Sequence, residues 1–136
     1  MTAATPRTIW IAAALIEDGE GRLLLVRKAG TEWFMQAGGK IEYGENPLTA
    51  LRRELSEEIG LVLAEDEARH IGCYSAPAAN EPDHIVRAEV FHIRARHDPV
   101  TRLEIEEATW VDLITAATMP LAPLTRDHIL PLAHTL

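Results

Sequence analysis

The chain has 136 residues, of which 47% are hydrophobic and 25% are charged, and its formal net charge is −8. This length and composition are those of an ordinary soluble globular protein, and we expect residues 1–136 to form a single domain. The acidic balance argues against a nucleic-acid binder, which would show a basic face. It does not exclude phosphate-containing ligands, because divalent cations reverse the field of an acidic site.

The first half of the chain predicts mainly strands. Thr8–Ile16 is apolar and rich in β-branched residues, and Arg22–Lys28 contains four consecutive aliphatic residues. The acidic, glycine-containing turn 17–21 joins them, so we expect the two strands to pair as a hairpin. The short apolar segment Trp33–Met35 and the strand-like segment Lys40–Glu42 follow.

The best-defined element is a helix from Pro47 to Ile59. Asn46 is a favourable N-cap residue, proline suits the first helical position, and Gly60 is a natural C-terminal stop. An apolar stripe at helical spacing predicts the buried face. It is made by Leu48, Leu51, Leu55 and Ile59.

The second half predicts further strands and two short helices. The strands are expected at His70–Ser75, His84–Ala95 and Thr109–Leu113, and the first helix near Ile114–Thr118. Another helix is expected from about Arg126, with Thr125 as its cap and Pro131 ending or kinking it. Strands before and after a central helix indicate a mixed α/β domain.

Cys73 is the only cysteine, so an intramolecular disulfide is excluded. Its apolar neighbours predict a packed, inert thiol. Residues 1–7 contain no signal-like apolar core, and no run approaches the length of a membrane span. We therefore expect a cytoplasmic protein without membrane association.

Three glutamates on the central helix suggest chemistry. Glu54, Glu57 and Glu58 are related as i, i+3 and i+4, so all three carboxylates share one face, away from the apolar stripe. Like charges at this spacing destabilise a helix, although Arg53 relieves part of the repulsion. Mg²⁺ prefers carboxylate oxygens together with waters and phosphates, which gives such a face a purpose. Taken alone, however, the three acids are more often a solvated surface.

The arrangement around this helix resembles the signature of the Nudix hydrolase family. The signature runs Gly, five residues, Glu, seven residues, Arg-Glu, an aliphatic residue, any residue, Glu-Glu, any residue, Gly and an aliphatic residue. Every fixed position is present across 23 residues. They are Gly39, Glu45, Arg53, Glu54, Leu55, Glu57, Glu58, Gly60 and Leu61. The likeness extends over about residues 8–118, and one departure is Ala37, where many relatives have proline.

The resemblance implies an α/β/α sandwich with a mixed β-sheet and a pyrophosphohydrolase that uses Mg²⁺ or Mn²⁺. Glu57 and Glu58 would bind metal, and Glu54 would bind metal or orient or deprotonate the attacking water. The catalytic set would then be Glu54, Arg53 and Glu57, with Arg53 ordering the glutamates and pairing with Glu45. The Gly38 carbonyl would complete the metal shell.

Relatives often add an acid from a later loop. Glu104, Glu106 and Glu107 are the alternatives, and spacing from Trp110 favours Glu104. The competing interpretation is that all three are surface acids.

The residues that bind substrate are not identified by the sequence. Pro77 is spaced like a proline marker of ADP-ribose pyrophosphatases, but a loop proline is usually a turn former. Trp33, Phe34 and Tyr74 could stack on a base, although packing is their commoner role. Nucleoside triphosphates, ADP-ribose, nucleotide sugars and dinucleoside polyphosphates all remain open.

We therefore expect a metal-dependent hydrolase that splits a pyrophosphate bond in a nucleoside diphosphate linked to another group. Its partner would be a small nucleotide-type substrate, not a nucleic acid. The family resemblance also makes a homodimer an expectation. The alternatives are a different reaction on a diphosphate, such as isomerisation, and a non-catalytic Nudix-fold sensor that binds a nucleotide.

Overall fold

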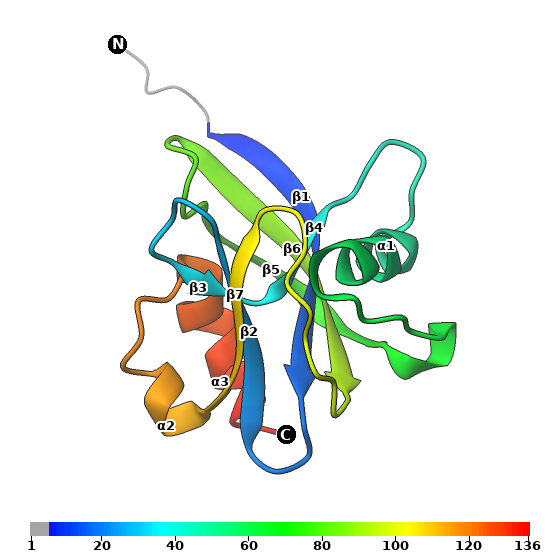
Figure 1. Cartoon of the computed structure of the whole chain (residues 1–136). Coiled ribbons are helices and arrows are strands. Elements are labelled where there is room, and N and C mark those ends of the chain that lie inside the picture. The colour runs from blue at the N-terminus through cyan, green and yellow to red at the C-terminus, as the bar shows by residue number, and fades with distance from the viewer. Residues whose placement is uncertain (1–5) are drawn as a thin grey trace.

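Helices cover both faces of one seven-stranded sheet in the computed structural model, which describes residues 6–136 (Figure 1). The strands are β1 (Arg7–Glu17), β2 (Arg22–Lys28), β3 (Phe34–Met35), β4 (Ala37–Lys40), β5 (Arg69–Pro77), β6 (His84–Arg94) and β7 (Ile105–Asp112). The helices are α1 (Pro47–Ile59), the 3₁₀ turn η1 (Glu65–Glu67), α2 (Leu113–Ala116), the π-helical η2 (Thr125–Ile129) and α3 (Leu130–Ala133). The predicted mixed α/β sandwich is confirmed.

The sheet is mixed because its central strand has neighbours of both directions. The strand order is β3-β2-β1-β6-β5, and β1 pairs in parallel with β6 from Arg7↔His84 to Glu17↔Arg94. On its other side β1 pairs antiparallel with β4, and β7 pairs with β2. A parallel pair needs a long crossover, and the chain between β1 and β6 supplies it.

The predicted hairpin of the first two strands exists only at its turn. β1 and β2 share the single pair Glu17↔Leu23, and beyond it β2 runs alongside β7. The adjoining edge of β1 is taken by β4 instead. The two strands therefore diverge, and side chains from both, including Ile9 and Val26, line a pocket between them.

Alternation along β1 divides the core into two layers. Ala12, Ala14 and Ile16 pack in the layer that contains α1, whereas Ala13 and Leu15 pack in the layer that contains η2 and α3. All five are fully buried. Successive side chains of a strand point to opposite faces, so the unbroken apolar run of β1 is explained by a sheet covered on both sides.

Helix α1 has the predicted boundaries. The Asn46 side chain accepts a hydrogen bond from the Thr49 N–H, and Gly60 ends the helix with a left-handed backbone at φ 68°. Leu51, Leu55 and Ile59 are fully buried against the sheet. The apolar stripe thus fixes which face of α1 points away from the core.

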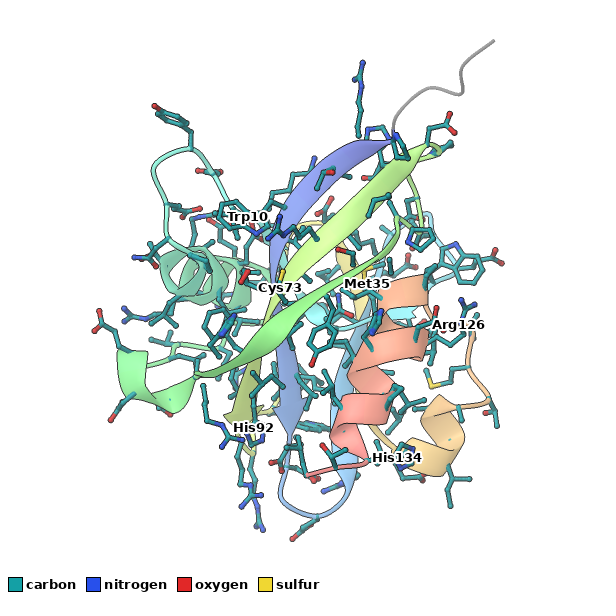
Figure 2. All side chains as sticks on the ribbon, turned by 180° about the vertical axis from the view of Figure 1, so that it is seen from behind. Trp10, Met35, Cys73, His92, Arg126 and His134 are labelled. Carbon is teal, nitrogen blue, oxygen red and sulfur yellow. The ribbon has the colours of Figure 1, made fainter. Side chains whose placement is uncertain are left out.

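The thiol of Cys73 is exposed, so the prediction of a packed cysteine was wrong. Cys73 lies on the edge strand β5, and its Sγ accepts a hydrogen bond of 3.4 Å from Arg87 Nε. Cys73 is labelled in Figure 2, as is Trp10 of β1, another residue with an exposed surface (47%). The apolar neighbours of Cys73 in sequence point to the other face of the strand, because β-strand side chains alternate.

The C-terminal helix differs from its prediction at the expected cap, and of the two effects expected of Pro131, ending the helix is excluded. Thr125 makes no capping hydrogen bond, and its hydroxyl instead donates to Gln36 Oε1 at 2.7 Å. Pro131 does not end the helix, since α3 continues through it to Ala133. The π-helical segment η2 ends two residues before this proline, in the turn where an α-helix would lose the hydrogen bond that proline cannot donate.

The last strand begins earlier than predicted, at Ile105, so Glu106 and Glu107 belong to β7. Within residues 6–136 no helix has the length and apolar character that crossing a membrane requires.

Candidate functional site

The glycines before α1 allow an unusually close approach of strand and helix. The Gly38 N–H donates a 2.9 Å hydrogen bond to Glu58 Oε1. A Cβ on Gly39 would lie 2.3 Å from the Glu54 carboxyl carbon, and one on Gly38 would lie 2.1 Å from the Ala12 carbonyl oxygen. Gly38 is therefore required for β4 to pair with β1, whereas Gly39 leaves room for the Glu54 carboxylate in its present position.

Arg53 is the centre of the polar network on this face. Its guanidinium donates to both carboxylate oxygens of Glu45 at 2.8 and 2.9 Å and to Glu54 Oε1 at 2.8 Å. It also lies 3.5 Å from Glu57 Oε2 and donates to the Lys40 carbonyl at 3.1 Å. Hydrogen bonding from Arg53 lowers the pKa of Glu45 to about 2. The predicted pairing of Arg53 with Glu45 and its contact with the glutamates are present.

Glu58 is the most buried of the three helix carboxylates, with 4% of its surface exposed. Burial raises its pKa to about 7, the negative charges of Glu54 and Glu104 add to the rise, and the Gly38 N–H opposes it. Burial also raises the pKa of Glu54 despite its hydrogen bond with Arg53. Burial thus disfavours the charged form of both carboxylates, and Glu58, unlike Glu54, has no charged partner within ion-pair distance in the described residues.

Among the three acids of the later loop, the structure separates Glu104 from the other two. Glu104 precedes β7 and lies 3.4 Å from Lys28 Nζ, and its charge acts on Glu58. Glu106 and Glu107 instead pair with Arg27, at 3.6 and 2.7 Å. Of these three acids, Glu104 is therefore the one in the electrostatic environment of the helix carboxylates.

These residues suit a hard divalent cation by their donor chemistry. Glu54, Glu57 and Glu58 offer carboxylate oxygens, the ligands that Mg²⁺ prefers, and a cation would neutralise the buried charge of Glu58. In the described residues 6–136, no three His, Cys, Asp or Glu side chains gather around one point. Glu54 is held by Arg53 and Glu58 by Gly38, while the Glu57 side chain is 46% exposed.

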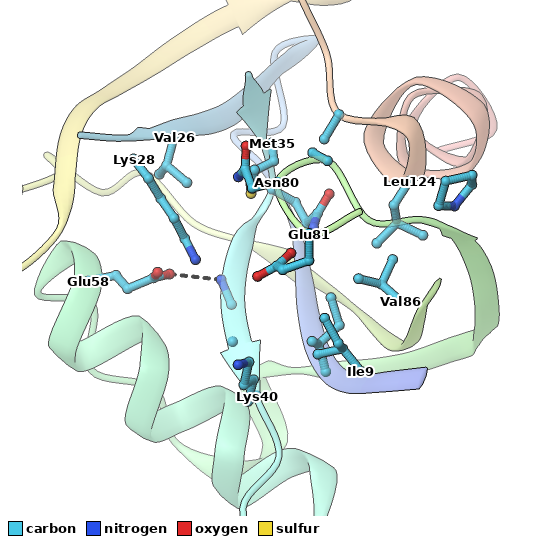
Figure 3. Close-up of a pocket in the computed structure, with 17 residues that line it drawn as sticks. Ile9, Val26, Lys28, Met35, Lys40, Glu58, Asn80, Glu81, Val86 and Leu124 are labelled. Atoms are coloured by element: carbon cyan, nitrogen blue, oxygen red, sulfur yellow. Dashed lines mark hydrogen bonds between the residues drawn. The ribbon is translucent and has the colours of Figure 1, made fainter. Parts of the chain in front are cut away.

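A pocket of about 770 Å³, counting its open mouth, adjoins the carboxylates (Figure 3). Glu58, Gly38, Gly39, Lys28 and Lys40 line its polar end. Its remaining walls are mainly apolar. They include Ile9, Ile11, Val26, Met35, Pro77, Val86, Ala122 and Leu124. A mostly apolar cleft with a few polar groups is the usual form of a small-molecule site.

The sequence did not identify several of these lining residues. Lys28, Gln36 and Glu81 come from three separate segments, and no local spacing connects them. Pro77 does line the pocket. The three aromatic residues weighed as base-stacking groups, Trp33, Phe34 and Tyr74, are not among the lining residues; Phe34 and Tyr74 pack against the core layer of η2 and α3.

Comparison with known proteins identifies the family of this chain. The model of the NUDIX domain matches residues 7–133. The chain belongs to the Nudix family. Members of this family generally use divalent metal cations.

Two relatives show what named Nudix proteins similar to this one do. The chain is 33% identical over 124 residues to the CTP pyrophosphohydrolase of Escherichia coli K12, covering 86% of this chain and 85% of that protein. It is 40% identical over 60 residues to the 8-oxo-dGTP diphosphatase of Haemophilus influenzae. That match covers 41% of this chain and only 44% of the Haemophilus protein.

A solved structure supports the same fold. The MutT protein from Methanosarcina mazei Go1 superposes with a TM-score of 0.79 at 21% identity, over 98% of this chain and 97% of that one. The Nudix fold therefore extends over nearly the whole described chain.

Proposed function

We propose that this Nudix protein hydrolyses a pyrophosphate bond in a nucleoside diphosphate linked to another group, such as a nucleoside triphosphate. The observation that carries the proposal is the buried carboxylate of Glu58, which belongs both to the glutamate face of α1 and to the lining of the adjoining, mostly apolar pocket. Its Nudix relatives named above act on nucleotide substrates. Mg²⁺ or Mn²⁺ is the proposed cofactor.

The proposed reaction is direct attack by water on one phosphorus. The water oxygen forms the new P–O bond, the bridging P–O bond breaks, the displaced group leaves with the bridging oxygen, and the proton lost by the water passes to Glu54 or to solvent. When bound, the cation would supply charge neutralisation and water activation. Glu57 and Glu58 would hold it, with the Gly38 carbonyl and Glu104 as further ligands.

Glu54 has two compatible roles, as a cation ligand or as the group that orients or deprotonates the attacking water. Its raised pKa makes it a stronger base than an ordinary carboxylate. Arg53 holds Glu54 at 2.8 Å and would fix its direction. Arg53 is therefore proposed as a positioning residue for the glutamates.

The proposed setting is the cytoplasm, with a small nucleotide rather than a nucleic acid as the binding partner. The net charge of −8 disfavours binding to a polyanion, and the single cysteine fits a reducing compartment. A homodimer remains an expectation from the family.

The test is release of phosphate and mononucleotide from a panel of nucleoside triphosphates, ADP-ribose, nucleotide sugars and dinucleoside polyphosphates. Assays contain Mg²⁺, Mn²⁺ or chelator. We expect cation-dependent release for the wild-type protein and a loss of about two or more orders of magnitude for Glu57→Gln. The matched control is Glu20→Gln, an exposed glutamate on the β1–β2 turn that pairs with Arg96.

Near-normal turnover by both Glu57→Gln and Glu58→Gln would overturn the mechanism. Nucleotide binding without turnover of any substrate would support the non-catalytic sensor instead.

A further inference from the structure

The pocket has a second end, away from the helix carboxylates. Figure 3 shows Glu58 and Lys28 on one side of β4 and Leu124 and Val86 on the other. Apolar side chains dominate the second end, so a flat, largely apolar group would fit there. If the phosphates lie at the carboxylate end, the nucleobase lies here.

Gln36 supplies a fixed polar group in this wall. It is 7% exposed, lies between β3 and β4, and lines the pocket. The hydroxyl of the fully buried Thr125 donates to Gln36 Oε1 at 2.7 Å. Thr125 is the first residue of the π-helical segment η2, and such segments are frequent at functional sites.

In the structure the Gln36 amide turns its oxygen towards the Thr125 hydroxyl and its nitrogen away from it. Its oxygen is occupied, and within the described chain its Nε2 makes no hydrogen bond. Among the described residues no fully buried side-chain nitrogen or oxygen lacks a partner, so Nε2 must reach accessible space. Because Gln36 lines the pocket, Nε2 is a donor available to a ligand there.

Glu81 supplies the complementary acceptor. It belongs to the loop between β5 and β6, and Figure 3 shows its carboxylate pointing into the pocket, between β4 and the apolar end. Within residues 6–136 no Lys, Arg or His side chain forms an ion pair with it. An ionised carboxylate is a hydrogen-bond acceptor only, so it favours a ligand amino group over a carbonyl oxygen. The neighbouring amide of Asn80 both donates and accepts and therefore does not distinguish these two groups.

We propose that Gln36 and Glu81 are specificity residues that select an amino-bearing base, such as cytosine, over its oxo counterpart, uracil. Glu81 accepts from the exocyclic amino group and repels a carbonyl oxygen at the same place. Gln36 donates to a carbonyl oxygen that both pyrimidines share, and Thr125 positions it. This inference deepens the proposed function and rests on it, because it assigns the base of the nucleotide substrate.

The first experiment compares calorimetric binding of CMP and UMP to the wild-type protein and to Glu81→Gln. We expect the wild-type protein to bind CMP about tenfold more tightly than UMP, the discrimination expected of one hydrogen bond to a charged group. The amide introduced by this substitution can turn either its donor or its acceptor to the base, so the ratio should fall towards one. Glu20→Gln is the matched control and should keep the wild-type ratio.

The second experiment separates the role of Gln36 from that of Glu81. Thr125→Val removes the hydroxyl and should weaken CMP and UMP by a similar factor of about five, because both lose the same donor. Thr125→Ser retains a hydroxyl and should restore affinity. Urea unfolding of each variant shows whether it is folded at the assay temperature.

Equal binding of CMP and UMP by the wild-type protein, or an unchanged ratio in Glu81→Gln, would overturn the specificity role of Glu81. If Thr125→Val lowers stability but leaves both affinities unchanged, the positioning role is wrong. Hydrolysis of CTP and UTP, measured side by side, distinguishes a failure of the specificity proposal from a failure of the proposed function. Selective CMP binding without cleavage of CTP or of any other substrate of the panel would contradict the hydrolase assignment, whereas cleavage without base preference would contradict only the specificity proposal.

Discussion

At the scale of single residues, the site combines one arginine with carboxylates in different environments. Arg53 contacts both Glu45 and Glu54, so these two acids are partly neutralised. Glu58 accepts a hydrogen bond from the Gly38 backbone N–H and is nearly buried. Desolvation of an incompletely compensated charge is costly, so the metal-free protein carries a local instability at Glu58 that a cation would relieve.

This instability predicts a pH dependence of folding. Burial raises the pKa of Glu58 to about 7, above its ordinary value of 4.5. Between these values the folded chain binds a proton that the unfolded chain has released, so stability falls as the pH rises. We expect Glu58→Gln to gain stability relative to wild type between pH 5 and pH 8, by up to about 3 kcal/mol.

The measurement is urea unfolding of wild type and Glu58→Gln in chelator at the two pH values. Added Mg²⁺ should stabilise the wild-type protein at pH 8 more than the variant. If the difference in stability between the two proteins is the same at both pH values, burial does not raise the pKa of the Glu58 carboxyl.

At the scale of elements, β4 and α1 form one unit in which the strand is shaped to admit the helix side chains. The N-cap and the glycine stop fix the ends of α1, and its leucines fix its rotation. The strand contributes two glycines, but for different reasons. Gly38 has φ 141° and lies against the backbone of β1, whereas Gly39 lies against the carboxylate end of the Glu54 side chain.

The two glycines therefore predict a contrast between two alanine variants. In Gly38→Ala the new Cβ meets a backbone carbonyl, so the strands must separate, and we expect a loss of about 2 kcal/mol or more. In Gly39→Ala the Cβ meets only the Glu54 carboxylate, which can turn away. Stability should then change by less than about 1 kcal/mol, while turnover falls at least about tenfold.

Urea unfolding and steady-state hydrolysis of both variants measure this contrast. A Gly39→Ala protein with full activity would show that the direction of the Glu54 side chain is not important. An undiminished stability of Gly38→Ala would show that β4 can pair with β1 without glycine.

At the scale of the whole molecule, the parallel pairing of β1 with β6 joins the two halves of the chain. The carboxyl ends of these strands are tied together by Glu17, whose Oε2 lies 2.7 Å from His92 Nε2 and 3.0 Å from Arg94 Nε. Burial alone would raise the pKa of Glu17, but hydrogen bonds with His92, Arg94 and the Gly19 N–H lower it overall. The ionised form is therefore favoured in the folded state.

Glu17 predicts a stability effect of opposite sign to that of Glu58. A lowered pKa contributes stability above the ordinary value of 4.5, and this contribution is lost as the pH falls through the folded-state pKa. Glu17→Gln should therefore destabilise the protein at pH 7 by about 1 kcal/mol, with a smaller difference at pH 4. Urea unfolding at both pH values tests this, and a deficit independent of pH would contradict it.

The chain order of the elements was largely predictable, whereas their pairing was not. The hairpin expected between the first two strands follows from their proximity in sequence, yet β2 pairs with β7, which lies in the last third of the chain. The Cys73 environment was misjudged for a related reason, since an edge strand and a central strand have similar local sequences. Non-local pairing and edge position depend on the whole sheet, and neither leaves a local pattern.

The sequence by itself determined the α1 helix, its glutamate face, the glycine pair before it and the Nudix signature. Each depends on spacing within a single segment, where helix geometry and capping are decided by neighbouring residues. Only the tertiary structure decided that Glu58 is buried, that the charge of Glu104 rather than that of Glu106 or Glu107 acts on it, and that Gln36 and Glu81 line one pocket. Burial, charge and enclosure arise between segments that are distant in the chain, so they exist only once the sheet has brought those segments together.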